Sequence, residues 1–164
     1  MSDQLQITTK LDAKGLPISA RCEGDVAATP EKVWQVLADV EGFAGRVPML
    51  SKVVRKGELV EVDLKFRITL FSVGFRFTAR ALIEEGRRLE LVWVSGEPRD
   101  MRLTLEVEPS QIGSRLVTTA AFDLYSLGWV VKYFLKHHPE IQCGVYPGVA
   151  IALHTHLGRA AAGL

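Results

Sequence analysis

The sequence predicts a single α+β domain over residues 1–164. In this domain a curved antiparallel sheet of about six to seven strands wraps around a C-terminal helix, and two short helices follow the first strand. A long central stretch alternates apolar and polar residues with a period of two, which is typical of half-buried strands. Apolar residues at helical spacing come before and after that stretch. The length of 164 residues suits one domain, and the sequence has no repeat or low-complexity linker to divide it.

The elements before the sheet begin with strands and end with helices. The expected strand, turn and strand cover residues 5–9, 12–15 and 18–27. Thr29 is then a good helix N-cap, and Pro30 stands at the first helical position, where its missing N–H costs nothing. The apolar residues of 33–40 share one helical face. We expect a second short helix over residues 40–44.

Residues 51–124 form the alternating stretch. Its apolar positions are every second residue from Val60 to Leu70, and again from Phe71 to Ile83. The parity changes between Leu70 and Phe71, so a turn or bulge belongs there. Further turn signals lie at residues 85–87, 95–98 and 109–113. The stretch therefore predicts about six antiparallel strands with one apolar face.

Helical spacing returns after the sheet. Residues 127–138 fit a helix that Pro139 interrupts, and residues 148–162 fit a further helix after Pro147. The sequence leaves open whether these pieces are one kinked helix or two. Because the apolar face of the sheet must be covered, and only helices are available to cover it, we expect the C-terminal segment to pack across the sheet.

A curved sheet closed by one helix need not collapse completely, so we expect an apolar cavity between them. The candidate wall residues are Phe66, Phe71, Phe75, Phe77, Trp93, Met101, Leu103, Thr118, Phe122, Trp129, Tyr133 and Phe134. Thr118, Thr104 or Tyr133 would orient a ligand, and the loop containing Gly42 and Gly45 would be its portal. Two alternatives stay open. The same periodicity fits a filled core, and the aromatic residues of 129–134 could instead form an exposed stripe for a membrane or a partner.

Ionisable residues are almost absent from the alternate strand positions that carry the apolar side chains. Arg67, Arg76, Arg80, Arg102, Glu106 and Asp123 fall on the opposite parity, which faces solvent in a packed sheet. No catalytic residue and no Ser/His/Asp, HExxH or CxxC arrangement can be identified. His154 and His156 are two residues apart and so point to different helical faces, which is poor geometry for one metal ion. We therefore expect no metal site and no cofactor. We expect these histidines to face solvent or to cap helices, and His137 and His138 to lie near a helix end, where they favour the C-terminal dipole.

Composition limits the partners and the compartment. The net charge is +1, which gives no electrostatic case for nucleic acid. Cys22 and Cys143 match neither a disulfide framework nor a zinc site, and we expect two buried, reduced thiols in a cytoplasmic protein. The start MSDQLQITTK predicts no secretory signal, and no apolar run reaches the roughly 20 residues of a membrane span. Peripheral membrane contact and the oligomeric state stay open.

Two segments carry a resemblance to a known superfamily. Residues 28–40, ATPEKVWQVLADV, resemble the first-helix signature of the START-like superfamily, which includes the polyketide cyclase/dehydrase and birch-pollen-allergen groups. Phe43 and Pro48 stand where that family often has an aromatic residue and a proline. Residues 71–80, FSVGFRFTAR, are similar to the coenzyme Q-binding branch. The resemblance extends to about Leu124 and implies a helix-grip fold with an internal cavity, although Pro139 and Pro147 depart from the family's uninterrupted final helix.

Three functions are compatible with these features. We favour the binding or transport of a small hydrophobic ligand, which could be lipid-like, quinone or polyketide-like. The branch resemblance makes a quinone the first candidate. The second function is a polyketide aromatase/cyclase or dehydratase, a lyase that needs an ionisable residue such as Arg67, Arg76 or Asp123 inside the cavity. The third is a protein-interaction module that docks through the C-terminal helical segment.

Overall fold

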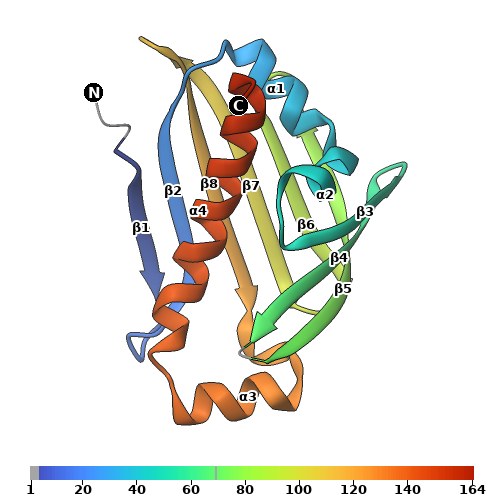
Figure 1. Cartoon of the computed structure of the whole chain (residues 1–164), viewed down its shortest axis with the longest axis vertical. Coiled ribbons are helices and arrows are strands. Elements are labelled where there is room, and N and C mark those ends of the chain that lie inside the picture. The colour runs from blue at the N-terminus through green and yellow to red at the C-terminus, as the bar shows by residue number, and fades with distance from the viewer. Residues whose placement is uncertain (1–3, 69) are drawn as a thin grey trace.

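The computed structural model describes residues 4–68 and 70–164 (Figure 1). Within these residues, eight strands form one antiparallel sheet in the order β1-β2-β8-β7-β6-β5-β4-β3. The strands are β1 (Gln6–Leu11), β2 (Pro17–Val26), β3 (Leu50–Lys56), β4 (Leu59–Ile68), β5 (Phe71–Glu84), β6 (Arg88–Gly96), β7 (Arg99–Ser110) and β8 (Gly113–Asp123). The helices are α1 (Pro30–Ala38), α2 (Phe43–Arg46), α3 (Gly128–His137) and α4 (Ile141–Ala162), with single 3-10 turns η1 (Val40–Gly42) and η2 (Leu124–Ser126).

The sheet follows the alternation of the sequence. Val60, Val62 and Leu64 of β4 are buried on the inward face, as is Phe77 of β5, which pairs with Val62. A turn or bulge was expected between Leu70 and Phe71, and the chain does reverse next to this point, because Ile68 pairs with Phe71 at the end of the β4–β5 hairpin. The α+β class and the C-terminal covering helix are also confirmed. The sheet is longer than six or seven strands because β1 pairs with β2 as an exposed outer strand.

The first helix begins where the sequence predicts. The Thr29 side chain accepts a hydrogen bond from the backbone N–H of Lys32 at 3.3 Å, and Pro30 is the first helical residue. The apolar face of α1, which includes Val33 and Leu37, is buried. The indole N–H of Trp34 donates to Glu85 at 3.0 Å and joins α1 to the β5–β6 turn.

The C-terminal segment is two helices divided at Pro139. Pro147 does not divide them, because α4 starts at Ile141 and continues through it, so the expected start at residue 148 is wrong. Pro147 lies in the second turn of α4 and deprives only the carbonyl of Cys143 of a helical partner, and Cys143 is exposed to water. In Figure 1, α4 crosses the face of β2 and β8, while α3 lies across one end of the sheet.

Two expectations about single residues are corrected. His154 is buried, with 3% of its surface exposed, because α4 presses this face of the helix onto β2, where Gly24 makes room for the ring. Cys143 is exposed, because it lies on the solvent side of the first turns of α4, whereas Cys22 is buried on β2 as expected. None of the described helices is long and apolar enough to span a bilayer.

Candidate functional site

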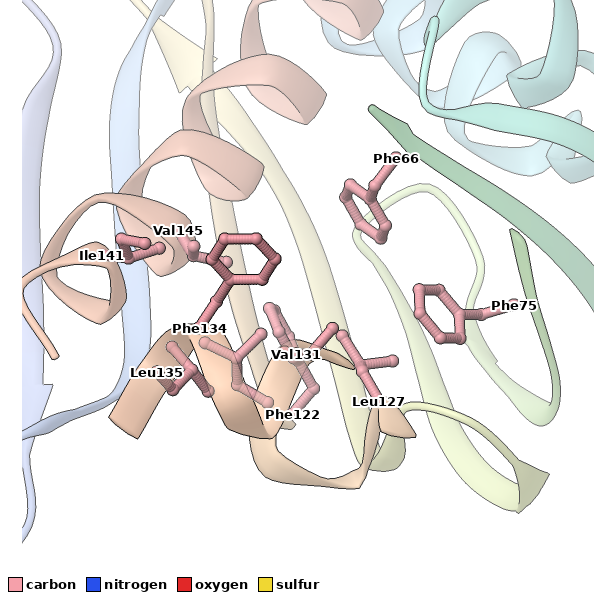
Figure 2. A pocket seen from close by; sticks show the side chains of 10 residues that line it. Phe66, Phe75, Phe122, Leu127, Val131, Phe134, Leu135, Ile141 and Val145 are labelled. Atoms are coloured by element: carbon pink, nitrogen blue, oxygen red, sulfur yellow. The ribbon is translucent and has the colours of Figure 1, made fainter. Parts of the chain in front are cut away.

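A pocket of about 230 Å³ lies at the end of the sheet where the β4–β5 hairpin faces α3 (Figure 2). Its lining consists of Phe66, Phe75, Phe122, Leu124, Leu127, Val131, Phe134, Leu135, Ile141 and Val145. These side chains come from β4, β5, β8, η2, α3 and the start of α4. The pocket is therefore formed by elements that are far apart in the sequence, and it is open on one side.

One wall of the pocket belongs to the β4–β5 hairpin. Phe66 shares the inward parity of β4 with Leu64, and Phe75 pairs with Leu64 across the hairpin. In Figure 2 both rings point from their strands toward the space in front of α3. Strand alternation therefore aims two aromatic side chains into the pocket.

The opposite wall belongs to α3. Val131 and Leu135 lie four residues apart on one face of α3, with Phe134 beside them, and Leu127, the residue just before the helix, continues the same spacing. Gly128 has a φ of +90°, a backbone conformation that favours glycine, at the sharp turn from η2 into the helix. This turn sets the direction of α3 and so the face that it presents to the pocket.

The floor of the pocket is held by a buried tyrosine. The hydroxyl of Tyr146 on α4 donates to the carbonyl of Phe122 at 2.8 Å, and the two ring centroids are 4.6 Å apart. Burial raises the pKa of the Tyr146 phenol. Close by, the buried amide of Gln142 donates to the hydroxyl of Tyr125. These hydrogen bonds satisfy polar groups beside the pocket and leave its surface apolar.

A second, smaller void of about 40 Å³ lies between the sheet and α4. Phe77, Met101 and Leu103 are among its lining residues, together with Phe43 of α2. Met101 packs against both core clusters, the large one under α1 and α4 and the smaller one beside α3. Met101 therefore joins the apolar surroundings of the two spaces.

The twelve candidate wall residues do not all line one cavity. Phe66, Phe75, Phe122 and Phe134 come together in the main pocket, and Phe77, Met101 and Leu103 line the smaller void. Trp93 lines neither space, and its indole N–H donates to the carbonyl of Gly96 at 3.1 Å. Thr118 is fully buried and also lines neither. The side chain of Phe71 lies outside the described residues.

Trp129 and Tyr133 lie outside the pocket, with 79% and 58% of their surfaces exposed. They occupy the face of α3 that also carries Lys132 and Lys136. The pocket is lined instead by the face with Val131 and Leu135. Tyr133 therefore cannot orient a ligand in this pocket, and neither can Thr104 or Thr118, which do not line it.

Sequence reasoning missed six lining residues: Leu124, Leu127, Val131, Leu135, Ile141 and Val145. The signal for three of them was present, because Leu127, Val131 and Leu135 form an apolar stripe without lysine. Ile141 and Val145 could not be assigned, since the start of α4 was expected beyond Pro147. The loop that was expected as the portal, with Gly42 and Gly45, does not border the main pocket: Phe43 between the two glycines is only 1% exposed and lines the smaller void.

Charged side chains stay out of the described lining. The guanidinium of Arg76 is 2.6 Å from the carboxylate of Asp63 on the outer face, and this contact holds the pKa of that carboxyl below its usual range. Asp123 accepts a hydrogen bond from the N–H of Tyr125 at 3.0 Å. The side chain of Arg67 lies outside the described residues. Residues 4–68 and 70–164 contain no group of three His, Cys, Asp or Glu side chains placed to hold a metal ion.

Comparisons with known proteins agree with this architecture. A family model described as polyketide cyclase / dehydrase and lipid transport matches residues 18–138. No curated protein matches the chain. A solved structure from Thermus thermophilus is 16% identical, with a TM-score of 0.66 over 89% of this chain and 97% of that one.

Two further similar structures belong to an aromatase/cyclase and to a START superfamily protein. An aromatase/cyclase from a Streptomyces species is 18% identical, with a TM-score of 0.55 over 95% of each chain. A START superfamily protein from Mycobacterium smegmatis is 15% identical, with a TM-score of 0.53 over 81% of this chain and 95% of that one. At these identities the likeness concerns the fold, and it confirms the predicted helix-grip architecture.

Proposed function

The chain belongs to the polyketide cyclase / dehydrase and lipid transport family, and we propose that it binds and carries a small apolar molecule in the pocket between the β4–β5 hairpin and α3. Lipid-like, quinone and polyketide-like molecules all have the required chemistry. The coenzyme Q-binding branch, which favours a quinone among them, stays a prediction.

The observation that carries this proposal is the chemistry of the lining. All ten lining residues are Phe, Leu, Val or Ile, and none has a side chain that can donate or accept a hydrogen bond. Water in such a space has few partners, whereas an apolar ligand gains by leaving bulk water. The site therefore suits a ligand held by burial of apolar surface.

The volume of the pocket limits the ligand. Ligand pockets usually measure roughly 300–1,000 Å³, so the 230 Å³ found here is small. A Kd of about 1 μM corresponds to roughly 8 kcal/mol, and association costs at least about 4 kcal/mol more. About 12 kcal/mol from burial corresponds to roughly 480 Å² of apolar surface at about 25 cal/mol per Å².

A ligand of that size has to extend through the open side of the pocket, or the pocket has to widen. α3 is the element best placed to move. It is joined to the sheet through the turn at Gly128 and to α4 through the break at Pro139. We expect ligand binding to displace α3 away from the β4–β5 hairpin.

Aromatase/cyclase activity is the second candidate, and it is supported by the family description and by the Streptomyces fold neighbour. Such catalysis needs an acid or base at the reacting atoms. The described lining offers none, and Arg76 and Asp123 make their contacts elsewhere. Carriage is therefore the function that this pocket favours. Turnover of a linear poly-ketone by the purified protein, seen as aromatic absorbance, would instead support the enzyme.

The experiment compares two neighbouring valines of α3. Val131→Phe puts a larger side chain into the pocket, whereas Val130→Phe makes the same change at a half-buried position that does not line it. Binding is measured by the fluorescence of N-phenyl-1-naphthylamine in lipid-free buffer. We expect Val131→Phe to weaken binding at least tenfold and Val130→Phe to change it less than twofold. Equal effects, or no binding by the unaltered protein, would refute carriage in this pocket.

A further inference from the structure

We infer that the outer face of α3 docks on a bilayer that contains anionic lipids. This face, called here the α3 outer face, consists of Trp129, Lys132, Tyr133 and Lys136. The inference goes beyond the proposed function, because a carrier can take its ligand from solution without touching a membrane. It starts from two aromatic side chains that the pocket does not use.

The α3 outer face is both aromatic and exposed. Trp129 and Tyr133 are one helical turn apart, with 79% and 58% of their surfaces exposed. The Tyr133 ring lies edge-on to Phe134, with centroids 6.1 Å apart, and 4.5 Å from the His137 ring. Neighbours therefore hold the ring in place without covering it. Trp and Tyr are the residues that favour the boundary between lipid and water.

The charge of the same face is complementary to anionic lipid. α3 has the sequence GWVVKYFLKH, with two lysines and no acidic residue. Lys132 and Lys136 are exposed, and neither takes part in a salt bridge among the described residues. The next acidic residue along the chain, Glu140, faces His138 at 3.3 Å. Each free lysine can therefore attract an anionic headgroup.

The α3 outer face lies close to the pocket, on the other side of the same helix. The opposite side of α3 lines the pocket through Val131, Phe134 and Leu135, so a bilayer on the outer face would lie about one helix diameter, ~10 Å, from the pocket. The β4–β5 turn lies at the same end of the molecule (Figure 1). It carries Leu70, which is 89% exposed, and Ile141 at the start of α4 is 42% exposed.

These observations favour a bilayer over a protein partner. Lysine is depleted in the cores of protein interfaces, yet here two lysines alternate with the two aromatic residues. Lysines that flank Trp and other apolar side chains are typical of helices that lie in the plane of a membrane surface. A short helix with two aromatic anchors suits reversible attachment rather than insertion.

The test is co-sedimentation with vesicles of pure phosphatidylcholine and of phosphatidylcholine with 30 mol% phosphatidylglycerol. We expect binding to the anionic vesicles only, and weaker binding as salt rises. Lys132→Glu/Lys136→Glu should weaken it at least about 25-fold, since one lysine near an anionic surface is worth roughly fivefold. Trp129→Ala/Tyr133→Ala, which removes both aromatic side chains, should abolish sedimentation with the anionic vesicles. Lys52→Glu/Lys56→Glu makes the same charge change on the exposed positions of β3 and should leave binding within threefold.

Further measurements decide between docking and its alternatives. Brominated lipid should quench the Trp129 fluorescence, and Trp129→Phe should remove that quenching. Absence of sedimentation, or equal binding of the two lysine variants, would overturn the inference. So would a concentration-dependent dimer that Trp129→Ala/Tyr133→Ala abolishes, because a second copy would then cover this face. Lys132→Glu/Lys136→Glu should still bind N-phenyl-1-naphthylamine in lipid-free buffer, so failure of docking is distinct from failure of carriage.

Discussion

Phe66 on β4 and Phe75 on β5 place their ring centroids 6.3 Å apart, with the ring planes inclined by 53°. The register pairs Phe75 with Leu64, so the two phenylalanines are diagonal neighbours on the inward face of the hairpin. They form the wall that faces α3 across the pocket (Figure 2). Because both rings are only partly buried, replacing one of them should cost less folding stability than replacing a fully buried phenylalanine. The same replacement should still weaken ligand binding, since it removes part of the pocket wall.

Phe75→Ala tests this distinction. We expect it to lower the free energy of unfolding by about 2 kcal/mol, below the roughly 3–5 kcal/mol of a fully buried phenylalanine, and to weaken binding of N-phenyl-1-naphthylamine. Phe77→Ala is the control, because Phe77 lies on the same face of β5 but is 4% exposed and borders the smaller void. Urea unfolding should show the larger loss for Phe77→Ala. The reverse order would contradict the placement of Phe75 in the open wall.

Two glycines should respond to alanine in opposite directions. Gly128→Ala should destabilise the protein by about 1–2 kcal/mol, because Gly128 has a positive φ that costs any residue with a Cβ. Gly144→Ala should stabilise it by up to about 1 kcal/mol, because Gly144 is an exposed helical residue with nothing near its missing Cβ. Thermal unfolding of both variants measures the difference. A stabilising Gly128→Ala would mean that the turn into α3 has another conformation.

Tyr146→Phe removes the hydrogen bond that holds the pocket floor. We expect a loss of about 1 kcal/mol, the usual net value of such a bond, because the hydroxyl is buried against the carbonyl of Phe122. Tyr133→Phe removes a hydroxyl from an exposed tyrosine and should change stability by less than about 0.5 kcal/mol. Urea unfolding of both variants at pH 7 gives the comparison. Equal effects would show that the bond to Phe122 does not form.

His154 should make the folded state sensitive to mild acid. Burial lowers the pKa of His154 below 6.5, and its Nδ1 has no hydrogen-bond partner among the described residues. Below pH 6.5 the unfolded chain therefore binds a proton that the folded chain resists. The stability due to neutral His154 is complete above pH 6.5 and falls as the pH drops, by at most about 1.4 kcal/mol per pH unit.

The variant His154→Leu should flatten this dependence between pH 6.5 and pH 5, above the range in which carboxylates titrate. The exposed His137→Gln should leave it unchanged. Asp25 and Arg159 line a groove together with His154, between β2 and α4, and both charged residues should be kept in both variants. Denaturant unfolding across this pH range measures the slope, and an unchanged slope in His154→Leu would assign the acid sensitivity to another group.

The fold could be predicted because it depends on local patterns. Thr29 and Pro30 mark the start of α1, and the parity of residues 60–83 gives both the inward face and the β4–β5 turn. These features follow from backbone geometry and strand alternation, whose range is a few residues.

The pocket could be predicted only in part, because its position depends on how distant elements meet. Residue size favoured Trp129 over Val131, although the neighbouring lysines mark the Trp129 face as exposed. Pro147 was expected to break a helix that tolerates it in the second turn. Burial of His154 depends on Gly24 of β2, which is 130 residues away in sequence and offers no local signal.

The most direct test of ligand binding in the pocket is NMR of methyl-labelled protein with bound N-phenyl-1-naphthylamine. We predict intermolecular NOEs from the probe to the methyl groups of Leu127, Val131 and Ile141, which line the pocket. We predict none to Leu157 or Ala161, which belong to the C-terminal half of α4 and are buried in the core. NOEs to Leu157 and Ala161 alone, or no NOE to any methyl group, would contradict binding in the pocket between the β4–β5 hairpin and α3.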